Sequence, residues 1–159
     1  MAPENWRARL AAGNCLWEWH DECVSELRQI EEWDHWGHGK LMSMVKASER
    51  GVGLVLDAEK ERCETPIPRA PRHYDDPVWL GELCRTGGKV YRKRVRPTWE
   101  LRIFYAIPIA HPRVVVGVAA FAKRTDDTKA GKKEEQRIRA AMDRAKWWFG
   151  QNRYELAPL

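Results

Sequence analysis

The segment WELRIFYAI, residues 99–107, decides the fold, and its larger apolar side chains occupy every second position: Trp99, Leu101, Ile103, Tyr105 and Ile107. That spacing is the period of a β-strand that buries one face in the core. A turn at residues 108–112 (PIAHP) leads to residues 114–122 (VVVGVAAFA), which are apolar at odd and even positions alike. Such a run is typical of an inner strand that is covered on both faces.

Two further strands are expected earlier in the chain. Residues 89–96 (KVYRKRVR) contain strand-forming residues, and their charges fall on both faces. We expect this strand to be either an edge of the sheet or a surface that contacts a ligand. Gly87 and Gly88 can turn the chain into it from a strand over residues 78–85. Residues 79–125 are therefore predicted to form a basic antiparallel sheet.

Apolar residues at helical spacing predict three helices. Two of them, over residues 19–34 and 41–51, form a hairpin around a glycine-punctuated turn at residues 35–39 (HWGHG). The third covers residues 131–150. Residues 52–78 are rich in proline and predict a surface connector, with room for one short strand.

The length and composition indicate one soluble globular domain. The chain has 159 residues, of which 43% are hydrophobic and 32% are charged. We predict an α+β fold over residues 1–159, in which an N-terminal helical hairpin (1–51) packs on a small antiparallel meander. The C-terminal helix follows the meander.

Charge is distributed unevenly along the chain. Between Glu18 and Asp34 the sequence contains seven acidic residues and one basic residue, Arg28. Between Lys89 and Arg124 it contains nine basic residues and one acidic residue, Glu100. Clustered lysine and arginine supply the contacts that bind phosphate. The sheet region is therefore expected to face a polyanion such as RNA, which the acidic helix would repel.

The chain shows no signal for a metal, a disulfide or a membrane. Four cysteines lack any CxxC pair, and neither Cys15 with His20 and Cys23 nor His35 with His38 has the paired spacing of a structural zinc site. No apolar run approaches the roughly 18 residues of a membrane span, and the first residues lack the apolar stretch of a signal peptide. We expect a cytoplasmic protein with free thiols, no metal and no membrane partner.

The order of helical hairpin, connector, basic sheet and final helix resembles the RelE/ParE superfamily of bacterial toxins, in particular its HigB-like, phage-related branch. Three segments carry the resemblance: residues 89–96, residues 99–106, and residues 114–125, which end in FAKRT. Residues 132–145 also resemble the terminal helix of that family. The resemblance implies an α+β fold with a curved sheet.

The resemblance also implies a function. Many members cleave messenger RNA in the decoding site of the ribosome, without a metal or cofactor, as the toxin of a toxin–antitoxin pair. The expected partners are then the ribosome, messenger RNA and a small helix-turn-helix antitoxin. The expected activity is that of an endoribonuclease, or mRNA interferase, which inhibits translation.

Individual roles follow from the same resemblance. It places Arg102 at an arginine that contacts the scissile phosphate, and Arg124 at an arginine that stabilises the transition state, with Lys123 beside it. Lys93 falls near a lysine that acts as a base or stabilises charge, although Arg85 in LGELCR is a rival for that position. Attack of a 2′-hydroxyl on the neighbouring phosphate needs such cations, together with a base and an acid.

The proton-transfer group is not fixed by the sequence. Tyr154 is the first candidate, followed by Tyr91 and His111, whereas Tyr105 has the parity of the core face. If none of these groups reaches the phosphate, the protein would be a binding relative without catalysis.

Each basic or aromatic candidate also has a structural interpretation. Arg102 lies opposite Leu101 and Ile103, so it can point outward to phosphate, or it can pair with Glu100 or cap a helix. Trp147 can stack on a base or pack under a basic side chain. The remaining candidate RNA contacts on the strand over residues 89–96 are equally compatible with a solvated edge kept basic to prevent pairing: Arg92, Lys93, Arg94 and Arg96.

Two other functions remain open from the sequence. The first is a non-catalytic module of the same fold that inhibits DNA gyrase or binds nucleic acid for a phage. The second is a partner-binding domain, because nine tryptophans exceed what one small core needs and the acidic helix could bind a basic protein.

Overall fold

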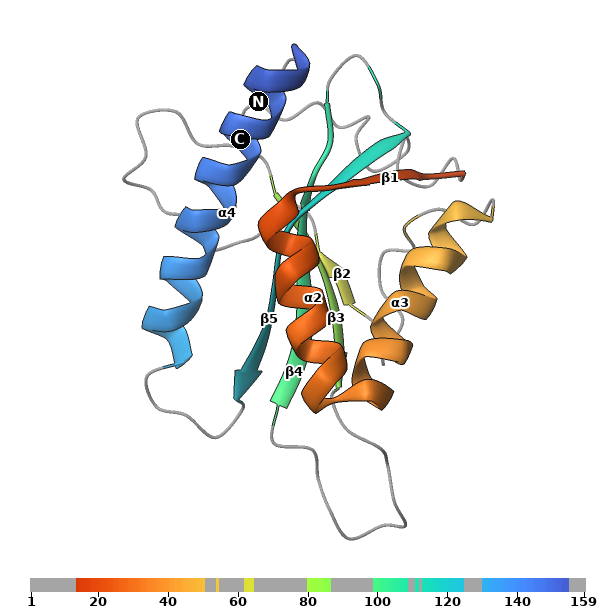
Figure 1. The fold of residues 1–159 in the computed structure, drawn as a ribbon, viewed down its shortest axis with the longest axis vertical. Helices are drawn as coiled ribbons and strands as arrows, with labels where there is room; N and C mark the ends of the chain where they lie inside the picture. Colours follow the sequence, from red (N-terminus) through yellow and green to blue (C-terminus); the bar gives the residue numbers. More distant parts are fainter. Residues whose placement is uncertain are drawn as a thin grey trace, which may run out of the picture.

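The computed structural model describes residues 14–50, 54, 62–64, 80–86, 99–108, 111, 113–124 and 130–154. In these residues the chain forms five strands and three helices, in the order β1 (Leu16–Trp19), α2 (Asp21–Trp33), α3 (His35–Glu49), β2 (Arg62–Glu64), β3 (Gly81–Thr86), β4 (Trp99–Ala106), β5 (Val114–Arg124) and α4 (Ala130–Asn152). The predicted α+β class is therefore observed (Figure 1). The predicted strand over residues 89–96 lies outside the described residues.

The strands form one sheet in the order β1-β5-β4-β3-β2. β5, β4, β3 and β2 pair antiparallel, whereas β1 pairs with β5 in parallel. The antiparallel pairing is as predicted, but β3 lies directly beside β4, whereas the predicted meander placed the strand over residues 89–96 between them. The short strand β2 falls within the proline-rich connector. β4 occupies the middle of the sheet, so its side chains have neighbours on both sides.

Helices cover both faces of the sheet (Figure 1). On one face, α2 and α3 pack against apolar side chains of β3, β4 and β5 that include Leu83, Leu101, Ile103 and Tyr105. On the other face, α4 packs against Phe104, Ala106, Val116, Val118 and Phe121. The prediction that β5 is covered on both faces is confirmed. The prediction that β4 buries only one face is wrong, because α4 covers the second face.

A β-bulge sets which residues of β5 face α4. Phe104 pairs with Ala119 and Tyr105 with Gly117, so Val118 is one extra residue in β5. Val118 and Ala119 consequently both join the core under α4. After the bulge, Phe121 and Lys123 face α4, whereas Ala120 and Ala122 face the other helices.

The predicted turn at residues 35–39 is wrong, since α3 begins directly at His35. Asp34 ends α2 and also starts α3, because its backbone N–H donates to Ile30 and its carboxylate accepts from the N–H of Gly37 at 2.8 Å. A Cβ on Gly37 would lie 2.3 Å from Asp34 Oδ2 and 2.6 Å from Leu101. The glycine therefore permits close packing of a helix and does not mark a loop.

The strand β1 was not predicted, and the helix expected from Trp19 begins only at Asp21. Trp19 stacks on Trp17 and lies directly over Gly117, where a Cβ would meet its ring at 2.4 Å. β1 is a strand because β5 offers it an edge, which local sequence does not reveal. Among the described residues, no helix is both long enough and apolar enough to cross a bilayer.

Candidate functional site

Arg102 projects from the centre of β4 into the layer between the sheet and α4. Its neighbours on the adjacent strands are Cys84 of β3 and Phe121 of β5. It does lie on the face opposite Leu101 and Ile103, but only 5% of the residue is exposed. The sequence left open whether Arg102 points outward to a phosphate or pairs within the protein, and here α4 covers the face on which it lies.

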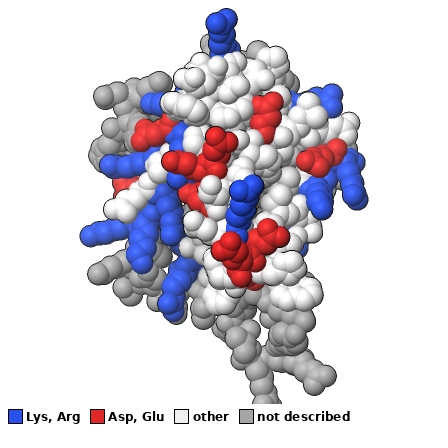
Figure 2. Space-filling model, in the orientation of Figure 1, with Lys and Arg blue, Asp and Glu red and all other residues white. Residues whose placement is uncertain are grey.

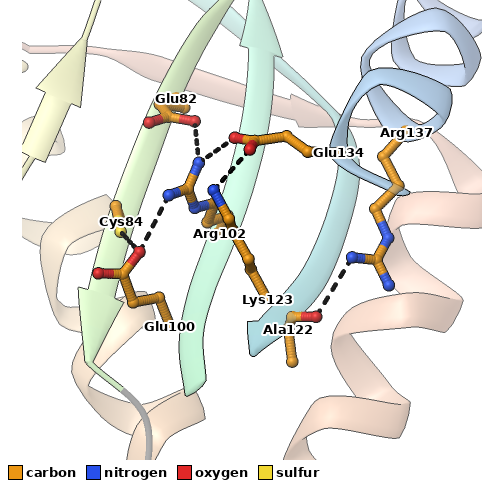
Figure 3. A network of polar contacts seen from close by, with 8 residues as sticks. All are labelled: Glu82, Cys84, Glu100, Arg102, Ala122, Lys123, Glu134 and Arg137. Atoms are coloured by element: carbon orange, nitrogen blue, oxygen red, sulfur yellow. Dashed lines mark hydrogen bonds and ion pairs between the residues drawn. The ribbon is translucent and has the colours of Figure 1, made fainter. Parts of the chain in front are cut away.

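The guanidinium group of Arg102 binds three carboxylates (Figure 3). Its Nη1 donates to Glu82 at 3.0 Å and to Glu134 at 2.5 Å, and its Nη2 donates to Glu100 at 2.9 Å. The pairing with Glu100 that the sequence left open is thus observed. Burial acts to lower the pKa of Arg102, but the carboxylates, Glu82 foremost, outweigh it and raise the pKa above its ordinary value. The group stays charged.

Glu134 lies between two cations. Its Oε1 accepts from Arg102, and its Oε2 accepts from Lys123 Nζ at 2.5 Å, so one carboxylate from α4 bridges side chains of β4 and β5. Only 8% of the Glu134 side chain is exposed, against 20% for Lys123. In these contacts Arg102 is shared by three carboxylates, and Lys123 binds one of them.

Two further side chains border the network. Cys84 Sγ donates a weak hydrogen bond to Glu100 at 3.6 Å, and burial raises the pKa of its thiol to about 12. Cys84 is therefore a protonated thiol and not a nucleophile. Arg137 of α4 lies over the ring of Phe121, 4.5 Å from its centroid, and donates to the carbonyl oxygen of Ala122.

One donor of the site is unused. Nε of Arg102 is buried and has no hydrogen-bond partner within the described part of the chain. A buried donor without a partner is uncommon and costs free energy. The guanidinium group could therefore give this N–H to an additional acceptor.

The other predicted catalytic arginine lies on the opposite face. Arg124 is exposed, and its cross-strand neighbour on β4 is Trp99. The ring of Trp99 packs on the side of α2 and α3, so Arg124 lies on that face of the sheet. Lys123, one residue earlier, faces α4 instead. Arg85, the rival for the position of Lys93, is the cross-strand neighbour of Leu101 and therefore lies on the same face of the sheet as Leu101, the face covered by α2 and α3. The structure therefore unites Arg102 with Lys123 and separates both from Arg124 and Arg85.

The first candidate for proton transfer is remote from this network. Tyr154 packs against Phe149 near the end of α4, and His111 contacts Tyr154 at 4.9 Å between ring centroids. Phe149 follows Glu134 by 15 residues, which is about 22 Å along the helix. Tyr105 is fully buried in the core, as predicted.

Trp147 is exposed on α4, with 58% of its surface free and one edge against His20 at 5.5 Å. It does not lie beneath a basic side chain that would bury it. Several of the predicted RNA contacts and the alternative Tyr91 cannot be placed, because they lie outside the described residues: Arg92, Lys93, Arg94 and Arg96.

Opposite charges gather over different elements of the surface (Figure 2). Lysine and arginine side chains collect at the left, over α4, whereas acidic side chains lie along α2 in the centre. The two helices meet where Arg144 binds Glu22 at 2.6 Å and Glu26 at 2.8 Å. The basic face of α4 includes the exposed Lys132 and Lys133.

The sequence did not reveal the roles of Glu82 and Glu134. Both are acidic residues in segments whose apolar neighbours predict burial, Glu82 in β3 and Glu134 one turn before Ile138. A buried acid needs a cation, and this is the signal that could have paired them with Arg102. Comparisons with models of known protein families, with curated proteins and with solved structures give no match to this chain.

Proposed function

We propose that this protein is a RelE-like toxin that binds messenger RNA at the ribosome and cleaves it by attack of the 2′-hydroxyl on the neighbouring phosphate. A small helix-turn-helix antitoxin would be its natural partner. One observation carries the proposal: Arg102 and Lys123, from adjacent strands, hold a single anion between them. Two cations on one oxyanion are the arrangement that a phosphate group requires.

The charge of the network supports a phosphodiester as the ligand. Glu134 supplies one negative charge to Arg102 and Lys123. An RNA phosphodiester also carries one negative charge, so replacing the carboxylate with it leaves the net charge of the network unchanged.

The surface around α4 supports RNA in particular. Lys132 and Lys133 are exposed near the start of the helix, and Trp147 is exposed near its end. Lysines attract the phosphate backbone, and a tryptophan offers a face on which an unpaired base can stack. The acidic surface of α2, which lies beside α4, would repel RNA from α2.

The second candidate is RNA binding without cleavage. It is favoured by the separation of Arg124 from Arg102 onto opposite faces of the sheet, and by the distance of Tyr154 from both. A transition state needs its cations and its proton-transfer groups around one phosphate. The binding surface is the same for both candidates, so they differ only in whether transcripts are cut.

The experiment is induction of the wild type and of Lys123→Ala in bacteria, with cell growth and transcript 5′ ends as readouts. Lys123→Ala is preferable to Arg102→Ala, since Arg102 still pairs with Glu134 in the variant and the buried carboxylate keeps a cation. The matched control is Lys46→Ala, an exposed lysine on α3.

We expect the wild type and Lys46→Ala to stop growth and to cut messages within codons, and Lys123→Ala to reduce cutting by about tenfold or more. Growth arrest with intact messages would favour the non-catalytic candidate. Normal growth with intact messages on wild-type induction would contradict the toxin proposal.

A further inference from the structure

The first two turns of α4 are attached to the sheet by polar contacts. Among residues 132–137, only Glu134 is buried, and Arg137 is half-buried over Phe121. The apolar attachment begins at Ile138 and continues through Met142 to Phe149. The start of the helix therefore depends on Glu134 and Arg137, while the rest is held by the core.

Within the described residues, the charges in the first turn of α4 do not favour a helix start. The first turn of α4 contains no acidic residue, and Lys132 and Lys133 lie near the end at which the helix dipole is positive. Gly131 also lowers the helical propensity there. Unwinding the first two turns therefore breaks polar contacts but exposes none of the apolar residues that attach the later part of the helix to the sheet.

Glu134 fills the position that the proposed phosphate would take. It binds both Arg102 and Lys123, and it closes the network from the side of α4 (Figure 3). A ligand phosphate can reach Arg102 only when this carboxylate has left, because Arg102 is 5% exposed. Lys123 is more accessible, so it can receive the incoming anion first.

We infer that Glu134 is an internal competitor for the phosphate of RNA: it occupies the Arg102–Lys123 anion site in the free protein and leaves, with the first two turns of α4, when RNA binds. This inference rests on the proposed function and adds a regulatory step to it. The closed state keeps the site neutralised, and only an RNA that also contacts the rest of the surface displaces the carboxylate. The displaced carboxylate of Glu134 moves into solvent, where its hydration offsets the loss of its ion pairs.

The test uses Glu134→Gln and the matched control Glu135→Gln. Glutamine keeps the size and the hydrogen-bonding oxygen of Glu134 but removes its charge. Glu135 is the next residue, lies on the surface and pairs with Arg139 at 3.1 Å, so its variant changes the overall charge equally without touching the site. Affinity is measured by fluorescence anisotropy with a labelled single-stranded RNA of about 12 nucleotides.

We expect Glu134→Gln to bind the RNA about tenfold more tightly than the wild type, and Glu135→Gln to gain no more than about twofold. Equal affinities of the two variants, with RNA still bound, would overturn the internal competitor and leave the proposed function in place. If neither variant nor the wild type binds RNA, both proposals fail.

Hydrogen exchange of the wild type gives a second test that does not depend on a variant folding. We expect RNA to speed exchange of the amides of residues 134–141, because these N–H groups donate to the carbonyl oxygens of the released residues 130–137, and to leave residues 142–149 unchanged. Slower exchange in residues 134–141 on RNA binding would contradict the release of this segment.

Discussion

At the scale of single residues, Arg102 is the most constrained charge in the described structure. Its three carboxylates come from β3, β4 and α4, so one side chain connects three elements. Burying such a network costs desolvation free energy, which the ion pairs and hydrogen bonds offset. Its value to stability therefore shows only when one partner is removed.

We predict that Arg102→Ala lowers the free energy of unfolding by about 3–5 kcal/mol, because it removes the buried cation that three carboxylates share. Urea denaturation at neutral pH measures the change. Arg28→Ala, at an exposed position of α2, should alter stability by no more than about 0.5 kcal/mol. A comparable loss in both variants would show that the network contributes nothing specific.

At the scale of elements, His20 joins β1 to α2. Its Nδ1 accepts a hydrogen bond from the N–H of Glu22 at 3.2 Å, which caps α2 and requires that nitrogen to be unprotonated. Burial, followed by the charge of Arg144, lowers the pKa of His20 below its ordinary value of 6.5. Arg144 belongs to α4, so the pKa of His20 depends on the contact between α2 and α4.

The lowered pKa predicts a loss of stability in acid. As pH falls through 6.5, the unfolded chain binds the proton before the folded protein does, so the unfolding free energy decreases until the folded pKa is passed. His20→Asn keeps a capping acceptor but does not titrate. Urea denaturation between about pH 7.5 and pH 5.5 should show a weaker pH dependence in the variant. Identical slopes for both proteins would count against this role.

Most elements could be predicted from periodicity, because burial of one face imposes a period on the chain. The predicted strands over residues 78–85, 99–107 and 114–122 correspond to β3, β4 and β5, and the helix over residues 131–150 corresponds to α4. The start of α3 was missed because Asp34 serves two helices without a loop. The bulge at Val118 was missed because an apolar run has no polar residue to mark the change of face.

At the scale of the whole molecule, basic side chains gather over α4 and acidic side chains lie along the neighbouring helix α2 (Figure 2). RNA is expected to approach along α4 and to be repelled by α2. Binding through phosphate contacts releases counterions, so it must weaken as salt rises.

We predict that the double variant Lys132→Ala, Lys133→Ala binds RNA with a shallower salt dependence. If each lysine contacts one phosphate, the slope of log affinity against log salt should fall in magnitude by about 1.4, or about 0.7 per contact. Anisotropy titrations at several salt concentrations measure the slope. A double variant on the other helices, Arg28→Ala with Lys46→Ala, should leave it unchanged, and an equal change there would contradict binding along α4.

The sequence by itself determined the strand and helix periods, the basic character of the second half of the chain and the parity that sets Arg102 apart from Leu101 and Ile103. Only the tertiary structure decided what Arg102 contacts. Parity tells which face of a strand a side chain occupies, but not whether a helix covers that face. The packing of α4, which follows β4 by more than twenty residues, brings Glu134 onto Arg102 and Lys123, and the register of β5 on β4 places Arg124 on the far face.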